Sequence, residues 1–372
     1  MRETGIYETL GGLQYFIPHS LPPQPGLVFT PEMIELYTQA SAALAQLDEM
    51  SKKLPDQKRF IKAYVIKEAL LSSSIEDIHT TLVEVFTQLL EDSKRSKDVQ
   101  LVLNYTQALD AALSLMQDQG LPLVSRVILK AHEVLMSVGE GDKATPGHFR
   151  KQSVRVGNFV PPPATQIQKL MSDLEQYINM ESDTSPLIKA GLAHLQFETI
   201  HPFLDGNGRI GRLLIVLMLI DGGLLKLPII YPSYYFKKHR FEYYQRLDRV
   251  RTHGDFEGWI LYYLQAIKES ALDAHVRATN IEMLEVRLKE LIQNEASFSK
   301  MKETAALVLE FLFRNPITTI VEISQSLDKA YNTVQKVLKE FASHSLVVEA
   351  TGRTRNKVYR FEPYLVCLEK EF

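Results

Sequence analysis

The chain has 372 residues, a length that predicts two or three domains rather than one. Its composition, 45% hydrophobic and 23% charged, excludes a collagen, a low-complexity scaffold and a wholly disordered chain. The net charge of −3 gives no global basic field for nucleic acid. A single cysteine, Cys367, cannot form an internal disulfide or a cysteine-based zinc site, so we expect a reducing compartment.

No segment has the composition of a membrane span or of a secretion signal. The longest fully apolar run, Leu213–Ile220, is far shorter than the ~20 residues that cross a bilayer. The first residues lack a basic region followed by an apolar core. We therefore expect a cytoplasmic enzyme or regulator without a membrane partner.

Helical spacing dominates the chain after an N-terminal arm. The proline-rich residues 18–26 predict an extended arm, and Thr30 followed by Pro31 predicts a helix start. Apolar residues then recur at intervals of three and four in Phe60–Leu71, Thr81–Leu90, Val99–Met116 and Leu187–Ile200. Further on, Asp255–Arg287 predicts a long helix or a helix pair, and Glu290–Lys302 a polar linker.

A non-helical insert, Ser153–Pro163, interrupts this pattern. Its residues Val154, Val156 and Phe159 are typical of a strand, and three consecutive prolines end it. The insert is the best candidate for a β-hairpin flap in a helical domain.

The last 70 residues have a different pattern. Helices are predicted over Thr304–Phe313, Ile320–Leu327 and Asn332–His344, and strands over Leu346–Glu349 and Lys357–Phe361. Three helices followed by a β-hairpin wing resemble a winged helix. Such a module binds either DNA or protein, and both alternatives stay open.

The charge of this segment only weakly favours DNA. Residues 302–372 contain ten Lys and Arg against nine Asp and Glu. Local basic residues are nevertheless present, Lys336 and Lys339 on the second helix of the pair and Arg353, Arg355 and Lys357 on the wing.

The densest cluster of functional residue types is His201–Arg212, with the sequence HPFLDGNGRIGR. Its glycines let the backbone approach an oxyanion, and an apolar helix follows, so the cluster predicts an anion site at a helix N-terminus. Asn207 adds a neutral donor, and Arg209 and Arg212 lie on one helical face, where their guanidiniums suit two successive phosphates. The carboxylate of Asp205 suits Mg²⁺.

His201 is the nearby group able to accept a proton near pH 7. His194 lies seven residues earlier, but no third ligand is placed beside the two histidines, so we expect His194 in the core rather than on a metal.

Two other nucleotide sites are excluded. Residues 206–211 match G-x-G-x-x-G, but a dinucleotide-binding fold needs a buried strand before the glycines, and here Ala190–Ile200 has helical spacing. The chain also lacks the G-x-x-x-x-G-K-[ST] of a P-loop.

The loop resembles the signature of Fic proteins, H-P-F-x-[DE]-G-N-G-R-x-x-R, with every specified position met. Further similarity covers roughly residues 10–275, including the flap. The resemblance implies a mainly α fold, a Fic helical bundle with a small β-hairpin flap, followed by the winged-helix domain. It also implies an enzyme that transfers AMP from ATP, with Mg²⁺, to a hydroxyl group of a target protein.

The same resemblance implies roles for individual residues. His201 is the general base and Asp205 the Mg²⁺ ligand. The residues implied in nucleotide binding are Glu76, His201, Gly206, Asn207, Gly208, Arg209, Ile210, Gly211 and Arg212, with Tyr235 as a candidate adenine or ribose contact. The flap residues Val154, Arg155, Val156 and Gly157 would hold the target by strand pairing.

An upstream motif, Ser72–Asp77, resembles the inhibitory helix [ST]-x-x-x-E-[GN] of many Fic proteins. Ser72 and Glu76 match this pattern, whereas Asp77 stands where Gly or Asn is usual. We expect residues 1–110 to form an arm and helices with the inhibitory helix around 68–80, residues 111–290 the catalytic core, and residues 300–372 the winged helix.

Two alternatives stay open in addition to self-inhibited AMP transfer. One is another Fic-type transfer or AMP removal, which the intact Gly208 and Arg212 disfavour. Another is a DNA-binding regulator in which the Fic core is secondary. The target is an unknown protein, with this chain itself as one candidate, and a homodimer is one alternative for the oligomeric state.

Overall fold

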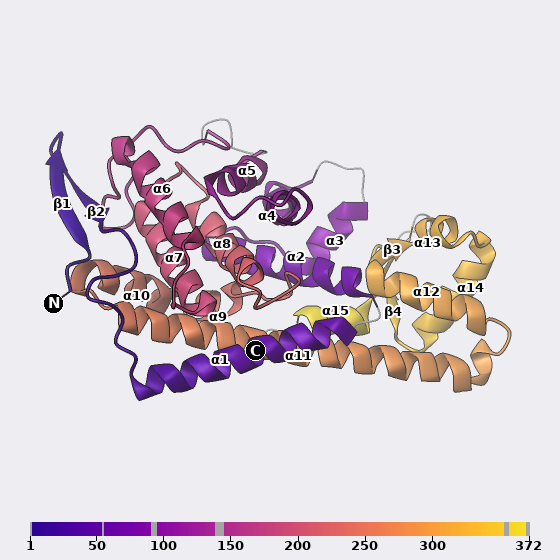
Figure 1. The fold of residues 1–372 in the computed structure, drawn as a ribbon. Helices are drawn as coiled ribbons and strands as arrows, with labels where there is room; N and C mark the ends of the chain where they lie inside the picture. The colour runs from indigo at the N-terminus through magenta and orange to yellow at the C-terminus, as the bar shows by residue number, and fades with distance from the viewer. Residues whose placement is uncertain (1, 54–55, 91–94, 138–144, 353–356, 370–372) are drawn as a thin grey trace. The chain divides into compact units, whose positions relative to one another are not determined.

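The protein is mainly helical, as expected from its sequence (Figure 1). The computed structural model describes residues 2–53, 56–90, 95–137, 145–352 and 357–369. The chain divides into two compact units. The first comprises Met1–Pro55, Tyr64–His79 and Gln100–Ala274, and the second comprises Asp56–Ala63, Thr80–Val99 and His275–Phe372.

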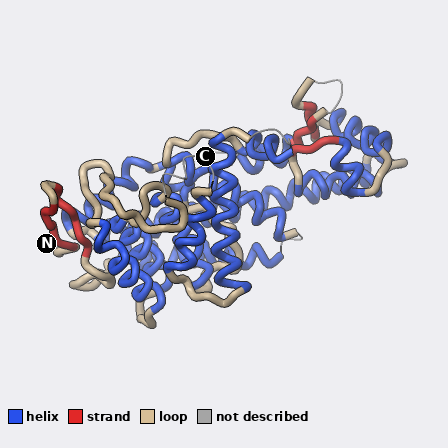
Figure 2. The backbone as a smooth tube through the Cα atoms, turned by 90° about the horizontal axis from the view of Figure 1, so that it is seen from above, coloured by secondary structure: helices blue, strands red, loops and turns tan. Residues whose placement is uncertain are grey.

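The first unit begins with a β-hairpin where the sequence analysis expects only a turn-rich arm. Strand β1 (Gly5–Leu10) pairs antiparallel with β2 (Leu13–Pro18), with Gly5 opposite Pro18 and Leu10 opposite Leu13. The two-residue turn consists of Gly11 and Gly12, both at positive φ, which is the geometry that glycine favours in tight hairpins. Figure 2 shows this hairpin in red beside the N-terminus.

The helices of the first unit surround a buried pair. Their bounds are α1 (Pro31–Lys53), α4 (Lys97–Leu113), α5 (Ser125–Leu135), α6 (Ala164–Asn179), α7 (Pro186–Ile200), α8 (Asn207–Asp221), α9 (Ser233–Lys238) and α10 (Arg240–His253). Helix α4 has its first three residues in the second unit, and two further helices, α2 (Gln57–Ile75) and α11 (Phe256–Asn294), likewise contribute residues to both units. A π-helical turn, η1 (Ser114–Asp118), continues α4.

Helices α7 and α8 pack side by side and form the centre of this unit (Figure 1). Nearly all of their side chains are buried, as expected for helices that are apolar all round. The loop between them and the start of α8 carry the cluster at 201–212, so the most buried helices of the unit position it.

The second unit contains a small three-stranded sheet, visible in red in Figure 2. Its elements are α3 (Leu82–Leu90), η3 (Ala296–Phe298), α12 (Lys302–Arg314), β3 (Ile317–Thr319), α13 (Ile320–Leu327), α14 (Tyr331–Ser343), β4 (Val347–Glu349), β5 (Val358–Phe361) and α15 (Glu362–Glu369). The strands are antiparallel in the order β3-β5-β4. Helix α13 begins with a capping box between Thr319 and Glu322.

Three features of the second unit differ from the sequence-based expectation. The predicted linker Glu290–Lys302 is wrong, because α11 continues to Asn294 and η3 follows, with Leu288 and Ile292 buried. Strand β3 and helix α15 were not expected. The wing residues Arg353 and Arg355 lie outside the described residues.

Among the helices that the structure describes, none combines the length and the apolarity needed to cross a membrane.

Candidate active site

The loop between α7 and α8 is shaped by two residues in the left-handed conformation. His201 ends α7 with φ of 51°, and Gly206 precedes α8 with φ of 80°. The Asn207 side chain closes the loop, because its Oδ1 accepts from Phe203 N at 2.8 Å and its Nδ2 donates to Phe203 O at 2.9 Å. The Asn207 amide is therefore not the free donor that the sequence analysis expects; its backbone N–H remains at the helix start.

The N-terminus of α8 has the features of an anion site. The first N–H groups of a helix have no intrahelical acceptor and carry the positive end of the helix dipole. Arg209 lies one turn in, with a side chain only 4% exposed. Its Nε and Nη1 have no hydrogen-bond partner among the described residues. A buried cation with unpaired donors beside a helix N-terminus requires an acceptor, and phosphate oxygens fit this requirement.

Asp205 lies at the exposed rim of this site, with 63% of its side chain exposed. Its Oδ1 accepts from Gly206 N and lies 3.5 Å from Arg209 Nη2. No group of three or more His, Cys, Asp or Glu able to hold a metal occurs among the described residues. One exposed carboxylate fits Mg²⁺, which commonly takes one or two protein carboxylates together with substrate phosphates and water.

His201 is half-buried and electrically neutral above about pH 4. Burial lowers the pKa of His201 to about 4, with the charge of Arg150 adding to this, while the carbonyl of Glu198 opposes it. Loss of solvent around the imidazolium is the dominant cause. A neutral imidazole can accept a proton, so the structure provides the form of His201 that a general base requires.

Arg150 is a buried residue that the sequence analysis missed. It donates from Nε to His201 O at 2.8 Å and from Nη2 to Pro162 O at 2.6 Å. Its Nη1 donates to Gln152 O at 2.9 Å. Arg150 therefore ties the backbone of the histidine loop to both ends of the 153–163 insert. A lone arginine in a loop carries no sequence signal for such a role.

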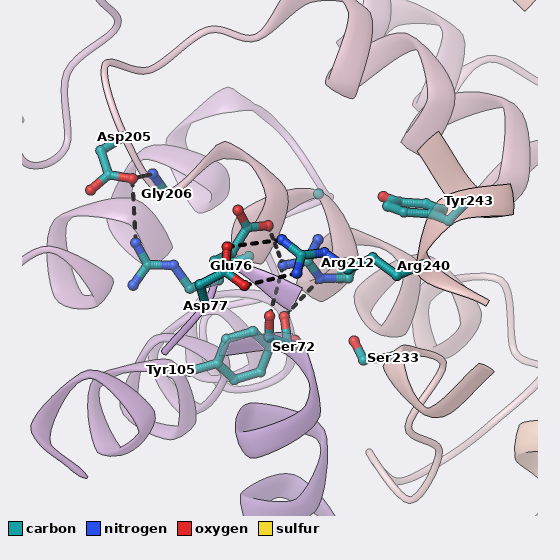
Figure 3. Close-up of polar contacts among 12 residues, drawn as sticks. Ser72, Glu76, Asp77, Tyr105, Asp205, Gly206, Arg212, Ser233, Arg240 and Tyr243 are labelled. Atoms are coloured by element: carbon teal, nitrogen blue, oxygen red, sulfur yellow. Dashed lines mark hydrogen bonds and ion pairs between the residues drawn. The ribbon is translucent and has the colours of Figure 1, made fainter. Parts of the chain in front are cut away.

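Arg212, fully buried on α8, meets the upstream motif (Figure 3). Its Nη2 donates to Glu76 Oε1 at 2.8 Å and to Ser72 O at 3.0 Å, and its Nε donates to Ser72 Oγ at 2.9 Å. Burial alone would raise the pKa of Glu76, but the charge and hydrogen bond of Arg212 outweigh burial and hold this pKa below its ordinary value. Three residues that the sequence analysis singled out are thus brought together.

Gly208 makes the approach of Glu76 possible. A Cβ at position 208 would lie 2.3 Å from Glu76 Oε1 and 2.9 Å from Arg212 Nη1. A side chain at position 208 would have to push the ends of Glu76 and Arg212 aside, whereas glycine lets the Glu76 carboxylate occupy the space directly above the first turn of α8.

A second carboxylate, Glu68, lies two turns earlier on α2 and is buried. Its oxygens accept from Ser233 N at 3.1 Å, Ser233 Oγ at 2.5 Å and Tyr105 OH at 3.3 Å. Burial raises the pKa of Glu68 to about 7, against the opposing effect of the Ser233 hydrogen bonds. Because Glu68, Ser72 and Glu76 are spaced by four, they share one face of the chain at the end of α2. That spacing was the signal that could have identified Glu68.

Three further residues predicted in the site, Ile210, Gly211 and Tyr235, pack against other side chains of the fold. Ile210 is 1% exposed in the core, and Gly211 packs closely against Glu198 of α7. The Tyr235 ring packs against His239 and Tyr262, at centroid distances of 4.3 and 5.4 Å.

His194 is a core histidine, as expected. Its Nδ1 lies 2.8 Å from Gly211 O and its Nε2 lies 2.8 Å from Tyr243 OH.

The insert at 153–163 forms a very short hairpin. Val156 and Phe159 exchange backbone hydrogen bonds of 3.0 and 3.1 Å around a turn that contains Gly157 at positive φ. Val160 pairs with Tyr15 of β2 in a parallel bridge, so the N-terminal hairpin supports the insert. Arg155 and Gly157 are exposed. The expected flap is present as one bridge rather than two strands.

The protein is thus mainly helical, the buried N-terminus of α8 has the features of an anion site, and the Glu76 carboxylate is paired with Arg212. Residues 122–219 match the family model of the Fic/DOC family, and residues 34–114 match the model of the Fic/DOC family N-terminal region. The chain therefore contains a Fic/DOC domain, preceded by a Fic/DOC N-terminal region.

Curated relatives are named Protein adenylyltransferase Fic. Those from Drosophila grimshawi and Drosophila erecta are 34% and 33% identical over 180 residues. These matches cover 48% of this chain, and the chain spans only about a third of each relative, 35% and 34% respectively.

Solved structures show the same fold at low sequence identity. A Fic family protein from Desulfovibrio desulfuricans matches with a TM-score of 0.56 and 21% identity, over 90% of this chain and 97% of the other. Fic-1 from C. elegans matches with a TM-score of 0.52 and 22% identity, over 65% and 71%.

Proposed function

We propose that this protein is a protein adenylyltransferase that transfers AMP from ATP to a hydroxyl group of a target protein. The observation that carries the proposal is the anion site at α8, with a buried Arg209 whose donors lack partners and a neutral His201 at the other end of the loop. The names of the curated relatives support the same activity.

In this proposal the loop binds the phosphates of ATP. The backbone N–H groups at Asn207 and Gly208 face the α- and β-phosphates, with the Gly206 backbone close by and its N–H held by Asp205, and Arg209 neutralises the departing phosphates. Arg212 binds the γ-phosphate once Glu76 leaves it. The requirements of the transfer are positioning and neutralisation of spread negative charge, which fixed donors in a buried site supply.

Asp205 is the proposed Mg²⁺ ligand, since its carboxylate is the exposed hard oxygen donor at the rim of the loop. When bound, the ion would neutralise charge on the phosphates. Asp205 also orients the loop through Gly206 N, so its substitution would affect loop geometry as well as metal affinity.

His201 is the proposed general base. The target hydroxyl oxygen attacks the α-phosphorus, the bond from this phosphorus to the bridging oxygen of the β-phosphate breaks, and pyrophosphate leaves. His201 accepts the hydroxyl proton as the new phosphorus–oxygen bond forms. The Arg150 hydrogen bond to His201 O holds the loop backbone during this step.

The geometry supports self-inhibition. Glu76 and a γ-phosphate would compete for Arg212, because both are anionic acceptors for one guanidinium. Ser72 holds the other edge of that guanidinium. Glu76 therefore blocks the productive phosphate pose while it stays paired.

The flap residues Val154, Arg155, Val156 and Gly157 are proposed to hold a target segment by strand pairing. The insert is anchored on one side by Tyr15 and Arg150. An extended target strand added there would lie beside the histidine loop, since Arg150 ties the two segments together.

We also propose that residues 300–372 are a winged helix. The order α12, β3, α13, α14, β4 and β5 with an antiparallel three-stranded sheet supports it. Tyr331, Asn332, Gln335, Lys336 and Lys339 are exposed on α14 and include no carboxylate, which favours duplex DNA as a second binding partner. A salt-dependent mobility shift with duplex DNA would test this.

The main proposal is tested by incubating Glu76→Gly protein with ATP and Mg²⁺, alone and with a cytosolic protein extract, followed by mass spectrometry. We expect adenylyl adducts on Ser, Thr or Tyr and one pyrophosphate per adduct. The matched Glu76→Gly, His201→Ala protein should give neither. Phosphate adducts with release of ADP would replace the proposal by phosphotransfer.

A further inference from the structure

The inhibitory helix ends in an unusual residue. Ile78 N donates to Ser73 O at 3.1 Å and Asp77 N donates to Ser74 O at 3.3 Å, the two hydrogen bonds of a Schellman cap. In this cap Asp77 is the residue that must be left-handed, and its φ is 58°. Glycine is usual there because a Cβ makes this conformation costly. Glu76 is the last residue before this turn.

The Asp77 side chain forms a two-pronged ion pair with Arg240, the first residue of α10 (Figure 3). Arg240 Nη1 donates to Oδ1 at 2.8 Å and Nη2 donates to Oδ2 at 3.0 Å. The hydrogen bonds and the charge of Arg240 hold the pKa of Asp77 below its ordinary value. Both side chains are exposed, 69% for Asp77 and 42% for Arg240.

We propose that Asp77 and Arg240 are positioning residues that hold Glu76 on Arg212 and so set the strength of self-inhibition. This inference rests on the proposed inhibitory role of Glu76. A glycine would end the helix with less strain but would leave its end unattached. The aspartate instead fastens the turn after Glu76 to α10, the helix that also carries Tyr243 of the buried core.

The expected effect is moderate because the pair is exposed. The bidentate geometry strengthens the ion pair between Asp77 and Arg240, but water and salt screen it. Exposed ion pairs shift equilibria by about twofold to fivefold. Releasing the pair should therefore raise AMP transfer by about twofold to fivefold. The effect should shrink as ionic strength rises, since salt weakens an exposed pair in the parent protein.

The test uses exposed positions that leave the fold intact. Asp77→Asn keeps the size of the side chain and a residue that tolerates positive φ, and Arg240→Gln removes the other charge. We expect each variant to derepress α-labelled AMP incorporation, and the double variant to match either single variant because one interaction is lost in all three. Arg246→Gln breaks a comparable ion pair with Glu242 further along α10 and should leave the rate unchanged.

The Glu76→Gly background separates this inference from the proposed function. There, Asp77→Asn should have no further effect, since the residue that it positions is gone. If Glu76→Gly is derepressed but both single variants behave like the parent, the positioning role is refuted while the inhibitory role stands. The positioning role is also refuted if Asp77→Asn still raises the rate in the Glu76→Gly background. If Glu76→Gly itself is not derepressed, both proposals fail.

Discussion

Replacing Glu76 by glycine should raise AMP transfer at least tenfold. The ion pair between Glu76 Oε1 and Arg212 Nη2 spans 2.8 Å. At an effective dielectric of ~20 this separation corresponds to about 6 kcal/mol of attraction before any desolvation is subtracted. Desolvation of Arg212 and solvent around Glu76, whose side chain is 35% exposed, remove most of this attraction. A remainder of about 1.4 kcal/mol already suppresses the productive ATP pose tenfold.

The assay measures incorporation of label from α-labelled ATP into the parent and variant proteins at equal folded concentration. Glu76→Asp should give an intermediate rate, because the shorter side chain reaches Arg212 less well. ATP affinity should change less than the rate, since a misoriented nucleotide still binds. Incorporation by Glu76→Gly that equals or falls below that of the parent would refute the inhibitory role of Glu76.

Further predictions concern the proposed general base His201, the loop residue Gly208 and the buried carboxylate of Glu68. In the Glu76→Gly background, His201→Ala should abolish transfer, while ATP binding, measured by calorimetry, persists. With His201 present, kcat/KM should be maintained at pH 5.5 and should fall only as the pH approaches about 4. A loss of kcat/KM with an apparent pKa near 6.5 would contradict the buried, neutral imidazole. Gly208→Ala in the same background should lower transfer at least tenfold. Its methyl group would lie 2.3 Å from the position that Glu76 Oε1 has in the parent protein, in the space that a phosphate needs. Full activity would place the phosphates elsewhere. The carboxyl group of Glu68 has a pKa of about 7 in the fold, so its contribution to stability is complete below about pH 4.5 and is lost as the pH rises through 7. In urea unfolding, the stability advantage of the parent over Glu68→Gln should therefore grow by up to about 3 kcal/mol from pH 8 to pH 5. A pH-independent difference would contradict the raised pKa.

The sequence predicted the parts of the site that are local in the chain. The glycines, arginines and histidine of His201–Arg212 lie within twelve residues, so their joint chemistry is visible without a fold. The apolar periodicity of Leu187–Ile200 predicted α7, and that of Phe60–Leu71 lies within α2. The resemblance to an inhibitory motif singled out Ser72 and Glu76, and the structure brings both to Arg212.

Contacts that depend on tertiary packing were not predictable in the same way. Arg150 binds four carbonyl groups, of which those of Ile200 and His201 lie 50 and 51 residues away, and no local pattern predicts these contacts. The polar surface of residues 290–302 suggested a linker, yet buried Ile292 keeps α11 helical to Asn294. The sequence showed that Asp77 stands where the inhibitory motif usually has Gly or Asn. The contact that Asp77 makes could not be predicted, because its partner Arg240 lies 163 residues away in the chain.

The central claim, transfer of AMP from ATP, is tested most directly with ATP labelled at either the α- or the γ-phosphate. Glu76→Gly protein would be incubated with each, with and without target extract, and protein-bound label would be counted after denaturing separation. The site geometry predicts label from the α-position, none from the γ-position, and none from either in the His201→Ala partner variant. Label from the γ-position alone would contradict AMP transfer and would identify the protein as a phosphotransferase.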